Sequence, residues 1–145
     1  MYKYTDNTQS NFLHFNQPIG LHMNPENRWV KMADAIPWEV FEKKYSRLFK
    51  GKNGRVAKPL RLALGSLIIQ TKYQYSDREL VEQLTENPYY KYFIGLPGYQ
   101  EEPPIDASTL VLFRKRLKMD IILEANEYML DAVKEKQFSD KKDDD

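Results

Sequence analysis

Residues 59–73 read PLRLALGSLIIQTKY, a stretch that is apolar almost all round. The proline at its start stands where the first turn of a helix tolerates proline. A helix with apolar residues on every side belongs at the centre of a core rather than on its surface. This stretch therefore predicts the central helix of an all-α domain.

Two further helices are predicted upstream of the central one. From Arg28 onward the apolar residues fall at helical spacing, and Pro37 then opens a second helical run, WEVFEKKYSRLF. The three- and four-residue spacing of apolar positions is typical of a face turned toward a core. The two stripes are Trp29, Met32 and Ala33, and then Trp38, Phe41, Tyr45 and Leu48.

The downstream half carries recognisable helix starts and stops. Ser76 and Glu79 form a capping box that begins SDRELVEQLTEN, and this helix should stop before Pro88. PYYKYFIG indicates a short aromatic helix or turn, and GLPGYQEEPP indicates a loop. Asp106 or Ser108 can then cap STLVLFRKRL, whose inward face is Leu110, Phe113 and Leu117. A last helix is expected over DIILEANEYMLDAVKEKQF.

The length of 145 residues favours one domain. We expect a compact multi-helix domain with flexible termini. Residues 1–27 lack a sustained period and predict a flexible N-terminal arm, and residues 28–118 form the helical domain. Residues 119–145 form a C-terminal helix with a charged tail.

Composition argues against several functions. The chain has no cysteine, so it has no disulfide and no cysteine-bound zinc. His14 and His22 are the two histidines, and both fall in the predicted arm. No segment predicts a membrane span, a secretory signal or a phosphate-binding glycine motif. We therefore expect a cytoplasmic protein without a catalytic residue, a metal, a cofactor or a small-molecule substrate.

The net charge of +1 averages over opposed blocks. Residues 28–73 carry +8 and residues 113–118 carry +4, whereas the other segments are acidic. From residue 43 to residue 61, eight lysines and arginines occur with no acidic residue among them. Such blocks indicate contact with a polyanion, although a solvated surface is the alternative. In the second block, Arg114 and Lys118 have the further alternative of pairing with the acidic helix 77–86.

Two segments, GRVAKPLRLALGSLIIQTKYQYSDRELVEQLTENPYYKYFIGLPG and DASTLVLFRKRL, together resemble a known family. They are similar to the N-terminal domain of insertion-sequence transposases that carry a ribonuclease-H-like catalytic domain with three carboxylates. The resemblance covers residues 29–118. The chain ends about where the catalytic domain of that family would begin, so its carboxylates have no counterparts here.

The resemblance implies a non-catalytic, helix-turn-helix-like domain that binds double-stranded DNA. Its role in DNA transposition would be to recognise the terminal inverted repeats of the mobile element. The implied DNA-binding residues are Ser108, Thr109, Arg114, Lys115 and Arg116, with support from Lys52, Arg55, Lys58 and Arg61.

Two alternatives remain open at this point. The predicted last helix has candidates for a second apolar face in Leu123, Tyr128 and Leu130, which favours a protein–protein module. A homo-oligomer through this helix is the partner that such a module implies. The other alternative is a truncated remnant of a transposase without a present function.

Overall fold

The computed structural model describes the backbone of residues 11–47 and 58–143, and the side chains of residues 11–47 and 58–131. Within these ranges a 3-10 turn precedes seven α-helices, which confirms the all-α class. The elements are η1 (Phe12–His14), α1 (Arg28–Ala35), α2 (Trp38–Ser46), α3 (Leu60–Tyr73), α4 (Asp77–Glu86), α5 (Pro88–Phe93), α6 (Ala107–Arg116) and α7 (Met119–Asp143).

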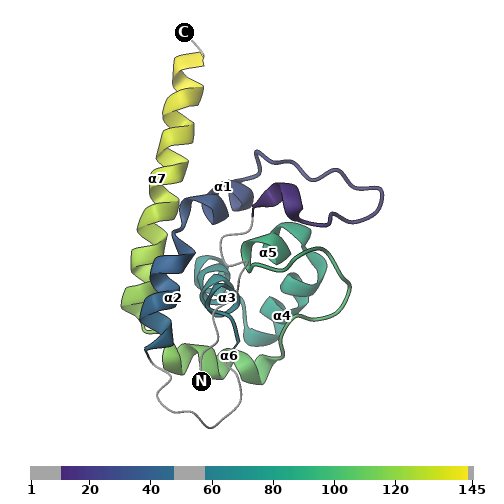
Figure 1. Ribbon diagram of the computed structural model, residues 1–145, viewed down its shortest axis with the longest axis vertical. Helices are drawn as coiled ribbons and strands as arrows, with labels where there is room; N and C mark the ends of the chain where they lie inside the picture. The colour runs from purple at the N-terminus through teal and green to yellow at the C-terminus, as the bar shows by residue number, and fades with distance from the viewer. Residues whose placement is uncertain (1–10, 48–57, 144–145) are drawn as a thin grey trace.

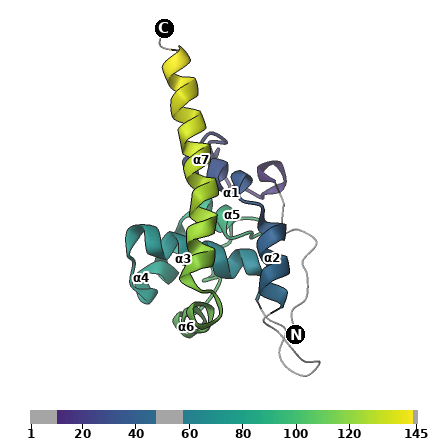
Figure 2. The same ribbon diagram turned by 90° about the vertical axis from the view of Figure 1, so that its left-hand side faces the viewer.

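α3 is the central helix, as its apolar sequence predicts. Every residue from Leu60 to Ile69 is buried. Figures 1 and 2 show α3 between α2 on one side and α4 on the other, and it also contacts α5, α6 and α7. A helix with neighbours on all sides needs apolar residues on all sides, which explains why residues 59–73 lack an amphipathic period.

Side-chain caps begin the helices where the sequence indicates. The Ser76 hydroxyl accepts the Glu79 amide at 3.1 Å and starts α4. α4 ends at Glu86, and Asn87 caps α5 by accepting the amides of Tyr89 and Tyr90. These caps satisfy backbone N–H groups that have no partner inside the helix.

Part of the N-terminal segment, expected as a flexible arm over residues 1–27, contacts the core. Its first ten residues lie outside the described part of the chain. Beyond them, the rings of Phe12 and Phe15 pack edge-on against Tyr92, with centroid distances of 5.4 and 5.7 Å. Met23 is buried as well. The segment is therefore anchored on the core by aromatic contacts that have no helical or strand period.

Lys91 is a buried cation that holds the loop after α5. Its ammonium group donates to Oε1 of Gln100 at 3.1 Å and to the carbonyl of Glu102 at 3.2 Å. It also lies 5.6 Å from the centre of the Tyr99 ring. Burial lowers the pKa of Lys91. These contacts compensate for lost hydration and tie the loop to α5.

α7 covers one side of the body with the first part of its length. Ile122, Ala125 and Met129 are buried there, and the helix contacts α1 and α3. Figures 1 and 2 show the rest of α7 extending past α1, away from the other helices.

Candidate nucleic-acid interface

The C-terminal ends of α2 and α6 lie at the same end of the molecule. The Tyr45 hydroxyl of α2 lies close to the guanidinium of Arg116 of α6. Burial raises the pKa of Tyr45, and the nearby guanidinium of Arg116 offsets part of the rise. Lys44 forms an ion pair with Glu124 of α7, with 3.0 Å between Nζ and Oε2. Two basic stretches that are far apart in the sequence are thereby brought together.

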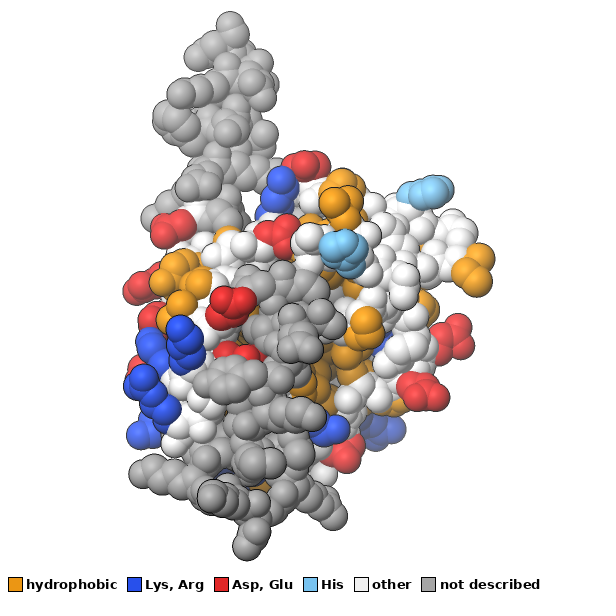
Figure 3. All heavy atoms as spheres, in the orientation of Figure 1, with side chains coloured by type: hydrophobic (Ala, Val, Ile, Leu, Met, Phe, Trp, Pro, Cys, Tyr) orange, Lys and Arg blue, Asp and Glu red, His pale blue; other side chains and the backbone are white. Residues whose placement is uncertain are grey.

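We call this region the basic end. Its cations are Lys43, Lys44, Arg47, Lys115, Arg116 and Lys118. Figure 3 shows lysine and arginine side chains gathered over the lower end of α2 and the start of α7. Among the described residues, no ion pair engages Lys43, Arg47, Lys115 or Lys118. Cations near helix C-termini are also favoured by the helix dipole, which offsets part of the repulsion among these charges.

α6 presents a continuous exposed face. Val111 and Leu112 lie three and four residues after Ser108, and Lys115 lies four and three residues after them, so all four share one side of the helix. All four side chains are exposed to solvent. The opposite side is committed to the core by Leu110 and Phe113, with Leu117 directly after the helix. Thr109 and Arg116 lie at one edge of the exposed face.

The N-terminus of α6 is capped by Asp106, one of the two predicted caps. Its Oδ1 accepts the Thr109 amide at 2.8 Å and the hydroxyls of Ser108 and Thr109, each at 2.7 Å. The two hydroxyls lower the pKa of Asp106 to about 2, with help from the Thr109 amide and the charge of Lys58. Ser108 and Thr109 therefore serve the cap, about 10 Å along the helix from Lys115.

Asp106→Asn is expected to lower stability at neutral pH but not near pH 2. Asparagine keeps the capping oxygen but not the charge. Because the folded pKa lies below the ordinary value of 3.8, the charge stabilises the fold above that pH. Its contribution is lost as the pH falls toward 2. Urea unfolding of both proteins across this range measures the difference, and a constant gap would contradict the cap.

Arg114 pairs with the acidic helix, which was one alternative for the second basic block. Its guanidinium binds both carboxylate oxygens of Asp77, at 2.7 and 2.8 Å, and reaches Gln70 at 3.2 Å. The hydrogen bond from Arg114 lowers the pKa of Asp77. Both side chains are partly exposed, so the pair stabilises the fold by at most about 1 kcal/mol. Arg114 links α6 to α4.

The structure corrects the expectation that Arg61 faces DNA. Its side chain is buried, with 3% of its surface exposed. Its Nε donates to the carbonyl of Phe93 and its Nη2 to that of Tyr92. Lys58 is exposed, just before α3. The other two expected contacts of this block, Lys52 and Arg55, lie outside the described residues.

The short turn in this region joins α3 to α4 and does not lead into α6, the helix that carries most of the implied DNA-binding residues. Residues 74–76 connect them, and Gln74 adopts a left-handed conformation with φ of 54°. α4 is acidic, because Arg78 is its one basic residue and its acidic residues are Asp77, Glu79, Glu82 and Glu86. The helices predicted over 76–87 and 108–117 are separated by α5 and a loop. An acidic helix would repel phosphates, so α6 is the better candidate for contact with DNA.

His14 and His22 are both exposed. Among the described residues, no three side chains of histidine, aspartate or glutamate gather as they would around a metal ion. None of the described helices is both long and apolar enough to cross a membrane.

Comparisons with known proteins agree with the earlier resemblance. The family described as Transposase domain (DUF772) matches residues 19–116. A curated relative, the uncharacterized protein ORF8 in the nfe locus of Rhizobium meliloti, is 36% identical over 103 residues. The match covers 71% of this chain and 49% of the relative, so the chain spans about half the length of that protein. No solved structure matches. The chain belongs to the DUF772 family of transposase domains.

Proposed function

We propose that this domain binds double-stranded DNA through the basic end, as the part of a transposase that recognises the terminal inverted repeats of its element. One observation carries the proposal: the fold joins two positive blocks, separated by α3, α4 and α5 in sequence, at the ends of α2 and α6. Lysine and arginine side chains that neutralise phosphates supply most of the affinity in sequence-independent DNA binding.

The exposed face of α6 is the proposed reading surface. An α-helix with its side chains is about 10–12 Å in diameter, so α6 fits a major groove about 12 Å wide. On this face, Lys115 can donate to guanine, and the methyl groups of Val111 and Leu112 can contact thymine methyl groups. Lys43 on α2 and Arg47 directly after it would then hold the DNA backbone beside the groove. Phosphate contacts position the protein, whereas contacts to base edges give specificity.

Asp106 sets the orientation of α6 in this proposal. A carboxylate at the N-terminus of α6 disfavours a phosphate there, although an uncapped helix N-terminus would attract one. The opposite end carries Lys115 and Arg116 and leads into Lys118. We therefore expect the duplex backbone to approach the C-terminal end of α6. Ser108 and Thr109 lie farther from that backbone than Lys115.

Lysine footprinting is expected to map the basic end. When a random-sequence duplex is bound, acetylation of Lys43, Lys115 and Lys118 should slow by about threefold or more, because phosphates cover their ammonium groups. Mass spectrometry of the free and bound protein measures each rate. Lys31 on α1 is the internal control, since it is exposed and lies outside the basic end.

The same experiment can contradict the proposal in two ways. Protection confined to Lys31 would place the DNA on another surface. Equal acetylation of all four lysines, under conditions where anisotropy shows a bound duplex, would mean that lysines outside this set carry the binding. Repeating the measurement in high salt should abolish the protection, because phosphate contacts weaken as salt rises.

A further inference from the structure

Arg114, Asp77 and Gln70 form a closed hydrogen-bonded network where α3, α4 and α6 meet. The Arg114 guanidinium donates to both oxygens of the Asp77 carboxylate, at 2.7 and 2.8 Å. The Gln70 amide nitrogen donates to Asp77 at 2.7 Å, and the Gln70 oxygen accepts from Arg114 at 3.2 Å. The same nitrogen donates to the carbonyl of Tyr75 at 3.2 Å, in the turn between α3 and α4. One side chain of α6 is thereby fixed to two other helices.

The network lies at the edge of the proposed reading surface of α6. Arg114 follows Val111 by three residues and directly precedes Lys115, so it borders the side of the helix on which these two residues lie. At the other edge, Arg116 lies close to the Tyr45 hydroxyl of α2. Lys115 therefore lies between two arginines that contact different neighbouring helices.

The ion pair within this network is too exposed to contribute much to the stability of the fold. The side chains of Arg114 and Asp77 are 42 and 30% exposed, so solvent screens their charges. Burial of Leu110 and Phe113 already holds α6 on the core. The two parallel hydrogen bonds nevertheless restrict rotation of α6 about its axis, because they fix an angle as well as a distance. The network is therefore suited to setting the orientation of α6.

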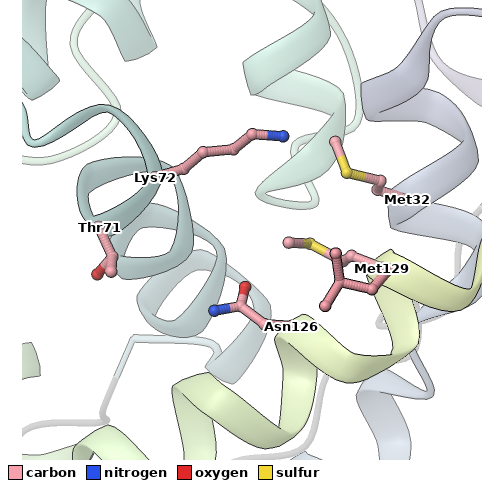
Figure 4. A pocket seen from close by; sticks show the side chains of 6 residues that line it. Met32, Thr71, Lys72, Asn126 and Met129 are labelled. Atoms are coloured by element: carbon pink, nitrogen blue, oxygen red, sulfur yellow. The ribbon is translucent and has the colours of Figure 1, made fainter. Parts of the chain in front are cut away.

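Close packing does not fix the last turn of α3 on its other side. A cavity of about 360 Å³ lies there, between α3, α1 and α7. Figure 4 shows Thr71 and Lys72 of α3 on one side of this cavity and Met129 of α7 on the other. Atoms that border a cavity lack part of the contacts of a packed interior. The hydrogen bonds of Gln70 therefore matter more for the position of this turn than they would in a fully packed core.

We propose that Asp77 is a positioning residue for DNA recognition: it binds Arg114 and thereby fixes the orientation in which α6 presents Lys115 to base edges. This role rests on the DNA-binding function proposed above. Contacts to base edges discriminate between sequences only where the recognition element is held within about 0.5 Å and 10–20°. Flexible lysine side chains can follow a small rotation of α6, so contacts to phosphates tolerate it. Opening the network should therefore reduce sequence discrimination more than general affinity for DNA.

A model based on charge alone predicts different results for the two partners. Removing the Asp77 carboxylate would strengthen DNA binding, and removing the Arg114 guanidinium would weaken it. The positioning role predicts that both changes lower discrimination, because either one opens the network. Asp77→Asn is the more informative of the two, since Asp77 itself does not contact DNA in this proposal.

Two duplexes are needed to measure discrimination. Selection from a random pool with the wild-type protein gives the preferred duplex, and a scrambled duplex of the same composition is the reference. Fluorescence anisotropy at one salt concentration gives the ratio of the two affinities. This ratio should fall by about fivefold or more in Asp77→Asn, while affinity for the scrambled duplex changes by less than about threefold. Arg114→Lys should lower the ratio as well, because lysine keeps the charge but not the planar pair of donors.

Glu79→Gln is the matched control for Asp77→Asn. Glu79 also lies in the first turn of α4, is exposed, and forms no ion pair within the described part of the chain. Glutamine is also accepted at this position of the capping box. The change removes a similar charge but leaves the network intact, so the ratio should stay within about twofold of wild type.

The possible outcomes distinguish the positioning role from the DNA-binding function. Urea unfolding first shows that each variant is folded under the assay conditions. A merely structural role of Asp77 would lower both affinities by the same factor and leave their ratio unchanged, which would overturn the positioning role alone. An equal fall of the ratio in Glu79→Gln would overturn it too, because charge and not the network would be responsible. If the wild-type protein selects no preferred duplex, sequence recognition by this domain is itself wrong.

Discussion

Replacing Arg61 with alanine is expected to destabilise the domain by about 3–5 kcal/mol, because it removes the donor of two buried carbonyl groups. The guanidinium donates to the carbonyl of Phe93 at 3.0 Å and to that of Tyr92 at 2.8 Å. It also lies over the rings of Trp38 and Tyr92, at 5.1 and 5.2 Å from their centres. Alanine leaves both carbonyls without this donor and opens a cavity between the rings.

Gly95 packs directly against the side chain of Arg61. Its φ is +86°, and a β-carbon there would lie 2.8 Å from Cδ of Arg61. A residue without a side chain is therefore required where the chain turns over the arginine. Arg61 joins α3 to the end of α5, and its loss should loosen both.

Urea unfolding followed by circular dichroism measures the effect of Arg61→Ala. Arg78→Ala on α4 is the matched control, since Arg78 is largely exposed and its contact with Glu82 is 3.9 Å long. It should change stability by less than about 0.5 kcal/mol. Arg61→Lys should fall between wild type and alanine, because one ammonium group does not reproduce the planar donor pair. If the Arg61→Ala protein kept its stability but bound DNA more weakly, Arg61 would contact DNA instead of stabilising the fold.

Local patterns predicted the helices well. The capping box at Ser76, the proline before α3 and the stop before Pro88 each depend on residues within a few positions of the helix end. The apolar stripe of α2 likewise follows from the helical period. Such features can be inferred from a sequence because their partners lie close by in the chain.

Features that depend on distant partners could not be predicted in the same way. In the sequence, Arg61 belongs to a run of lysines and arginines without acidic residues. The carbonyl groups that accept its hydrogen bonds belong to residues more than 30 positions away. Phe12 and Phe15 show no period, because they pack on a single ring of α5. The sequence also does not indicate that the C-terminal end of α2 lies near that of α6, which the structure shows through Tyr45 and Arg116.

Removing four charges from the basic end is expected to lower affinity for any duplex by roughly 10²- to 10³-fold at 0.1 M salt. The variant is Lys43→Ala, Arg47→Ala, Lys115→Ala and Lys118→Ala combined. These four side chains are exposed and form no ion pair within the described part of the chain, so their loss should spare the fold. Lys44 and Arg116 are kept, because Lys44 binds Glu124 and Arg116 lies close to the Tyr45 hydroxyl.

A control variant that loses two charges elsewhere shows how much a lower net charge alone weakens binding. Lys31→Ala with Arg78→Ala removes two exposed cations from α1 and α4, away from the basic end. It should lower affinity by no more than about threefold, through the loss of long-range attraction alone. Circular dichroism melts of both variants should match wild type to within a few degrees.

The salt dependence of duplex binding tests the DNA-binding proposal most directly. Fluorescence anisotropy at several salt concentrations gives the slope of the logarithm of affinity against the logarithm of salt, which reports the number of phosphates neutralised. We predict that the slope of the four-residue variant is shallower than that of wild type by about 3–4, while the control variant keeps the wild-type slope. Equal slopes for wild type and the four-residue variant, with both proteins folded, would contradict DNA binding by the basic end.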